Sequence, residues 1–100
     1  MRIDFESSGG YANLRLALHV DTEELPQDVA DELARLVEDS GFFGLAPPAE
    51  GTRIPDAVSY RLSLRAAGQE NDLSFTDATM PPALRPLVQR LTDLAIEARR

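Results

Sequence analysis

The chain has 100 residues, which is enough for one domain with a single core and too few for two. It contains no cysteine, no tryptophan and a single histidine, His19, which excludes disulfide scaffolds, thiol nucleophiles and self-contained Cys/His zinc clusters. Seventeen acidic residues against ten arginines and no lysine give a net charge of −7, the wrong sign for binding nucleic acid or an anionic membrane. No apolar signal segment or membrane-spanning stretch is visible, so we expect a soluble cytoplasmic protein.

Two segments near the start alternate apolar and polar residues, as half-buried strands do. They are residues 2–6 and residues 11–20. The connection between them is rich in turn-forming residues, namely Ser7, Ser8, Gly9 and Gly10. We therefore expect an antiparallel hairpin with these four residues at its tip.

An apolar stripe at helical spacing predicts a helix after the second strand. The stripe consists of Leu25, Val29, Leu33, Leu36 and Val37. Pro26 suits the first turn of this helix, and Gly41 suits the left-handed position just beyond its end. We expect at least one of Phe42 and Phe43 to lie in the core and to close that end of the helix.

Acidic charge is concentrated in residues 21–39. Eight acids face one arginine there, so this segment accounts for the whole net charge of −7 and the rest of the chain is balanced. Such a segment either keeps a small protein soluble or attracts a basic partner.

The second half repeats the order strand, strand, helix. Residues 44–56 carry three prolines and no periodicity, and a loop of this length suggests a role of its own. Residues 57–65 and 72–76 alternate as strands around a turn at residues 66–69. A second apolar stripe predicts a helix that starts near two adjacent prolines, with members Leu84, Leu87, Val88, Leu91, Leu94 and Ala95.

The predicted fold is α+β, a two-layer sandwich in ββαββα order. A four-stranded antiparallel sheet is covered on one face by two helices, because all four strands have one apolar face. The other face is left to solvent, where arginines can pair with acids across the strands. The candidates for these pairs are Arg15, Arg61 and Arg65 with Asp4, Glu6 and Asp72.

The residues needed for catalysis are sparse. His19 and Asp21 lie two apart on one strand, but no Gly-x-Ser-x-Gly motif is present and the serines lie at the strand's far end. Gly9 and Gly10 join two strands, whereas phosphate-binding glycines precede a helix. An enzyme that works through His19 remains one alternative, and a binding module that needs no metal or cofactor is the default expectation.

The chain resembles the emfourin family over nearly its whole length, as a single domain of residues 1–100. Members are small inhibitors of thermolysin-like zinc metallopeptidases such as protealysin, and are often encoded beside the peptidase. The resemblance therefore implies an inhibitor that is not an enzyme, with such a peptidase as partner and a monomer when free. It is carried, in order, by Glu6-Ser7-Ser8-Gly9-Gly10-Tyr11, Asp21-Thr22, Leu25-Pro26, Leu36-Val37, Ser40-Gly41-Phe42-Phe43, Leu45, Pro47 and Pro81-Pro82-Leu84-Arg85-Pro86-Leu87.

The resemblance also implies where a peptidase would be met. A narrow hairpin tip fits a cleft, and thermolysin-like enzymes prefer a bulky apolar side chain just after the cleaved bond. The expected partner-binding residues are Ser7, Ser8, Gly9, Gly10 and Tyr11. If the first helix runs antiparallel to the second strand, the loop after it shares this rim, and Pro47, Pro48 and Glu50 become secondary candidates.

An alternative function uses the acidic segment instead. In this hypothesis the chain is a non-inhibitory adaptor that binds a basic partner through the first helix, and its binding weakens as salt increases.

Overall fold

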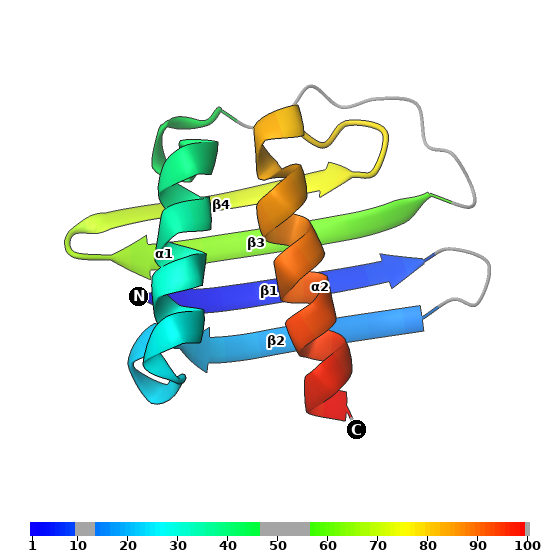
Figure 1. The fold of residues 1–100 in the computed structure, drawn as a ribbon. Helices are drawn as coiled ribbons and strands as arrows, with labels where there is room; N and C mark the ends of the chain where they lie inside the picture. Colours follow the sequence, from blue (N-terminus) through cyan, green and yellow to red (C-terminus); the bar gives the residue numbers. More distant parts are fainter. Residues whose placement is uncertain (10–13, 47–56, 100) are drawn as a thin grey trace.

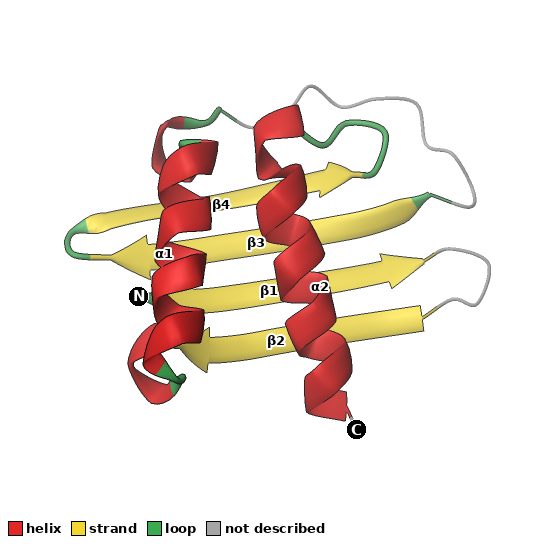
Figure 2. Ribbon diagram, in the orientation of Figure 1, coloured by secondary structure: helices red, strands yellow, loops and turns green. Residues whose placement is uncertain are grey.

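The protein folds as a four-stranded antiparallel sheet with two helices on one face (Figures 1 and 2). A computed structural model describes residues 1–9, 14–46 and 57–99. The expected α+β class and ββαββα order are confirmed. The elements are β1 (Arg2–Gly9), β2 (Leu14–Asp21), η1 (Thr22–Glu24), α1 (Gln27–Ser40), η2 (Phe42–Gly44), β3 (Val58–Ala66), β4 (Gln69–Thr76), η3 (Pro82–Leu84) and α2 (Arg85–Arg99).

The sheet has the strand order β2-β1-β3-β4, so β1 and β3 are its central strands. β1 pairs antiparallel with both β2 and β3, and the second pairing joins the two hairpins into one sheet. Because its backbone is hydrogen-bonded on both sides, β1 is held more firmly than the edge strands β2 and β4.

β1 is longer than the sequence predicts. Ser7, Ser8 and Gly9 belong to the strand and are not part of a turn, since Ser7 pairs with Leu16 and Tyr60. The turn preference of serine and glycine is weak compared with a hydrogen-bond ladder on both sides. The expected tip of residues 7–10 is therefore wrong for its first three residues. β2 begins at residue 14, three residues later than expected, so the β1–β2 connection consists of residues 10–13.

The apolar stripe of α1 faces the sheet as predicted. Leu33 and Val37 are buried, and the rest of the stripe is partly buried. Pro26 immediately precedes the helix, and Gly41 ends it in the left-handed conformation at φ 64°, with its N–H donating to the Glu38 carbonyl. The next residue, Phe42, is fully buried, which confirms that one phenylalanine closes this end of the helix.

α1 crosses the strands and does not run antiparallel to β2, so the condition for a shared rim with the loop after α1 is not met (Figure 1). It starts beside the end of β2 and finishes near β4, where Asn71 donates to the carbonyl of Phe42. The two helices lie side by side so that together they cover the apolar face of the sheet. As a result, α1 ends at the opposite end of the sheet from Gly9.

The core lies between the sheet and the helices and takes side chains from every strand and both helices. No described helix is both long and apolar enough to cross a membrane. The buried apolar residues are Ile3, Phe5, Leu16, Leu18, Leu33, Val37, Phe42, Leu62, Leu64, Leu73, Phe75, Leu84, Leu87, Val88, Leu91 and Ala95.

The solvent-facing side of the sheet carries ion pairs, though not all of those expected. Arg61 pairs with Asp72 at 3.0 Å, as predicted. Arg65 pairs instead with Glu70, its direct cross-strand neighbour. Exposed pairs of this kind contribute little stability individually, so the helix-covered face carries most of the folding free energy.

Candidate functional site

The first site lies at the end of the sheet where β1 stops, around Gly9. Gly9 has a φ of +110°, and a Cβ at this position would lie 2.7 Å from the Ala57 carbonyl oxygen. Only glycine fits this combination of backbone conformation and close approach. The chain that leaves β1 is therefore held directly against the start of β3.

Aromatic side chains stiffen the same end of the sheet on its helix-facing side. Tyr60 stacks between Phe5 and Phe75, with ring centroids 6.2 and 5.6 Å away. Burial raises the pKa of the Tyr60 phenol, and the nearby carboxylate of Asp77 raises it further. The three rings tie β1, β3 and β4 together next to Ser7, so the strand leading to the hairpin connection has a rigid base.

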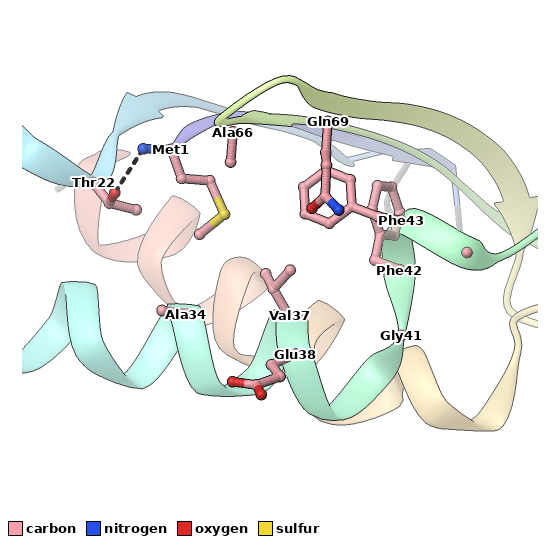
Figure 3. Close-up of a pocket in the computed structure, with 11 residues that line it drawn as sticks. Met1, Thr22, Ala34, Val37, Glu38, Gly41, Phe42, Phe43, Ala66 and Gln69 are labelled. Atoms are coloured by element: carbon pink, nitrogen blue, oxygen red, sulfur yellow. Dashed lines mark hydrogen bonds between the residues drawn. The ribbon is translucent and has the colours of Figure 1, made fainter.

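A second feature, the α1-end pocket, opens at the opposite end of the sheet (Figure 3). Its volume is about 430 Å³, within the usual range of binding pockets of roughly 300–1,000 Å³. Its walls are mainly apolar. Among the described residues that line it, Glu38 has a charged side chain and Met1 carries the N-terminal ammonium, which donates to Thr22 Oγ1 at 3.1 Å. The lining residues are Met1, Thr22, Ala34, Val37, Glu38, Gly41, Phe42, Phe43, Gly44, Ala66 and Gln69.

His19 lies on the solvent-facing side of the sheet between two carboxylates. Its Nδ1 is 2.8 Å from Asp4 Oδ1, and its Nε2 is 3.7 Å from Glu6 Oε1. The hydrogen bond from His19 lowers the pKa of Asp4, and Arg2 acts in the same direction. Asp21 instead accepts a hydrogen bond from the backbone of Glu23, so His19 contacts Asp4 and not Asp21.

This arrangement does not assemble a catalytic triad. Ser8 is opposite Arg15 in the β1–β2 register, whereas His19 is opposite Asp4, four positions further along the strand. Within the described part of the chain, no three histidine, aspartate or glutamate side chains are grouped to hold a metal ion.

Comparison with known proteins adds one match. The Emfourin family model matches residues 5–92, from β1 to the middle of α2. The chain belongs to the emfourin family. No curated protein and no solved structure matches it. Membership of this family is consistent with a metallopeptidase inhibitor domain that is not an enzyme.

In this emfourin domain, the predicted partner-binding residues fall into two groups. Ser7 is buried on the helix-facing side of the sheet with 7% exposure, while Ser8 and Gly9 are partly exposed at the end of β1. The other predicted site residues lie outside the described residues; they are Gly10, Tyr11, Pro47, Pro48 and Glu50.

The ends of the described segments show how the second group relates to Gly9. The chain leaves the described part at Ala46, near η2 and the start of β4, and resumes at Ala57, in contact range of Gly9. The expectation that the loop after α1 begins at the rim of the hairpin is therefore wrong. Ala57, the first described residue after this loop, lies against Gly9.

Sequence reasoning did not find the α1-end pocket. Its lining comes from Met1, η1, α1, η2 and the adjoining ends of β3 and β4, and no local pattern indicates that these segments meet. In the sequence, Gly41 and the two phenylalanines after it indicate only the end of a helix.

Proposed function

We propose that this emfourin domain inhibits a thermolysin-like zinc metallopeptidase by filling its active-site cleft with the β1–β2 connection. The observation that carries the proposal is the pairing of β1 on both sides as far as Gly9. Fixing the ends of a connection in paired strands lowers the conformational entropy that binding must remove, which favours tight association. The zinc ion belongs to the target, and the inhibitor needs no cofactor.

The contact residues follow the order of the chain out of β1. Ser8 and Gly9 form the base of the contact, and Gly10 and Tyr11 continue from it. Ser7 supports the strand from the covered side of the sheet, since its side chain is buried. We infer that Tyr11 places its ring in the pocket that takes the residue after the cleaved bond.

A secondary contact involves the segment between Ala46 and Ala57. This segment must end beside Gly9, because Ala57 lies there. In this proposal Pro47, Pro48 and Glu50 extend the surface that meets the peptidase, and their truncation weakens inhibition less than truncation of Tyr11.

Inhibition by tip variants tests the placement. Tyr11→Ala and Gly10→Val should each weaken inhibition of a thermolysin-like peptidase by about tenfold or more, because a central anchor dominates such contacts. The first peptidase to test is any encoded beside this chain, since family members often have that arrangement. Circular dichroism and the unfolding midpoint show that each variant is folded.

Gly44→Ala serves as the matched control. It lies at the opposite end of the sheet, and an added Cβ there meets nothing within 4 Å. It should inhibit as the wild type does. Unchanged potency of folded Tyr11→Ala and Gly10→Val would exclude the hairpin connection as the inhibitory element.

The acidic face of α1 supports a second candidate function, a non-inhibitory adaptor for a basic partner. Every acidic residue of α1 is exposed, and only Glu32 forms an ion pair with a described residue, Arg90, at 2.7 Å. An adaptor of this kind leaves peptidase activity unchanged and releases its partner as salt is added.

A further inference from the structure

The C-terminal end of α1 is electrostatically unfavourable as it stands. Glu38 and Asp39 occupy its last turn, which contains no basic residue. A helix C-terminus carries partial negative charge and favours cations, so two carboxylates there repel the helix dipole. Across residues 1–9, 14–46 and 57–99, neither carboxylate takes part in an ion pair. A cation placed at this end would remove the repulsion.

The α1-end pocket opens beside this last turn of α1. Glu38 is one of its lining residues and holds its carboxylate at the outer side of α1, while the remaining wall is largely apolar, with Val37 on the helix side, Phe42 and Phe43 at one end and Ala66 on the sheet side (Figure 3). A site of this kind suits a group that is apolar at its centre and positively charged at its edge.

The wall formed by Phe42 is fixed before any ligand arrives. The Phe42 N–H donates to Ser40 Oγ at 3.2 Å, and its carbonyl accepts from Asn71 Nδ2 at 2.8 Å. The Ser40 hydroxyl in turn donates to the Val37 carbonyl at 2.7 Å. A preformed wall lowers the entropy lost on binding.

We propose that the α1-end pocket is a second protein-binding site, which takes an apolar side chain flanked by arginine or lysine from a partner segment. The apolar side chain fills the pocket, and the flanking cation pairs with Glu38. This surface is separate from the inhibitory one. β1 spans its eight residues between the two sites, roughly 25 Å at about 3.3 Å per residue. A peptidase and a basic partner can therefore bind at the same time.

Short peptides test this site by NMR titration of the intact chain. The probe is an acetylated and amidated Arg-Phe-Arg tripeptide, and the comparison peptides are Glu-Phe-Glu and Arg-Ala-Arg. The basic aromatic peptide should shift the amide signals of Val37, Glu38, Gly41 and Gln69 at millimolar concentration. Both comparison peptides should bind at least about fivefold more weakly, since Glu-Phe-Glu lacks the cations and Arg-Ala-Arg lacks the aromatic ring.

Variants at exposed positions distinguish binding in the pocket from nonspecific attraction of the peptide to the acidic residues of α1. Ala34→Leu narrows the pocket and should weaken peptide binding about tenfold or more by steric exclusion. Glu38→Gln should weaken it about two- to fivefold. Asp39→Asn is the matched control, because it removes the same charge one residue away without lining the pocket. It should change the affinity by less than half the effect of Glu38→Gln.

Four results would overturn the proposal. They are no shifts at millimolar peptide, equal binding of the acidic peptide, equal effects of Glu38→Gln and Asp39→Asn, and pocket shifts that depend on protein concentration without peptide. The last result would assign the pocket to a second copy of the chain. Ala34→Leu and Glu38→Gln should inhibit a thermolysin-like peptidase as the wild type does, and weaker inhibition by either variant would contradict the separation of the two sites.

Discussion

Gly9 is a position where the backbone itself excludes every other residue. A residue with a side chain is strained at its φ of +110°, and the added Cβ would lie only 2.7 Å from the Ala57 carbonyl oxygen. We expect Gly9→Ala to lower the free energy of unfolding by about 1–3 kcal/mol, because the strand must distort to accommodate the Cβ. Urea unfolding followed by circular dichroism measures the loss.

Gly44→Ala is the control for this substitution. It has open space around it and no positive φ, so it should leave the free energy of unfolding unchanged or raise it by less than about 1 kcal/mol. Equal stability of Gly9→Ala and the wild type would mean that β1 does not pass as close to Ala57 as the structure has it.

The titration of Asp4 depends on a neighbouring side chain. Its pKa lies below the ordinary value of 3.8, first because His19 Nδ1 hydrogen-bonds to it and then because of Arg2. A lowered pKa in the folded state stabilises the protein above that ordinary value, and the contribution disappears as pH falls through the folded-state pKa. Both side chains are more than one third exposed, so solvent screening keeps the stabilisation small.

NMR titration of the Asp4 carboxyl group checks this assignment. In His19→Ala the Asp4 pKa should rise toward its ordinary value, because the hydrogen bond to the carboxylate is lost. Arg2→Ala should raise it by a smaller amount. An Asp4 pKa that does not move in His19→Ala would show that the imidazole does not bind this carboxylate in solution.

At the scale of elements, Asn71 connects β4 to the segment after α1. Its Nδ2 donates to the carbonyls of Phe42 and Leu45 at 2.8 and 3.0 Å. Asn71→Ala should lower the free energy of unfolding by about 1–3 kcal/mol, since two partly buried carbonyls lose their donor. Hydrogen exchange of the Gly44 and Leu45 amides, which pair within η2, should accelerate along with it.

Asn71→Asp is a second test of the two hydrogen bonds that Asn71 donates. The carboxylate nearly preserves the shape of the side chain but directs negative charge at two carbonyl oxygens, so it should destabilise at least as much as alanine. Ser74→Ala, an exposed position on the same strand, should be nearly neutral. Full stability of Asn71→Asp would contradict the double hydrogen bond.

Among the elements, some parts of the fold can be predicted from the sequence and others cannot. Alternation predicted the four strands, and a period of 3.6 predicted α1 and α2, because burial of one face imposes that spacing locally. The extension of β1 through Ser7, Ser8 and Gly9 was not predictable in the same way. It depends on pairing with β3, which lies about fifty residues further along the chain.

At the scale of the whole molecule, the direction of α1 decides which features share an end of the sheet. Its amphipathic stripe determines which face it buries but not the angle at which it crosses the strands. That angle follows from the packing of two helices over one sheet. The α1-end pocket and the Gly9 end are consequently separated, and the sequence contained no local signal for that separation.

The central claim is that this chain blocks a metallopeptidase cleft from one end of its sheet. The most direct test measures the inhibition constant against a thermolysin-like peptidase at several concentrations of a small peptide substrate and at two salt concentrations. Inhibition should be reversible and should weaken as substrate increases, because both occupy one cleft, and it should change little with salt. Full peptidase activity at saturating, folded inhibitor would contradict the account, and so would inhibition that is independent of substrate concentration.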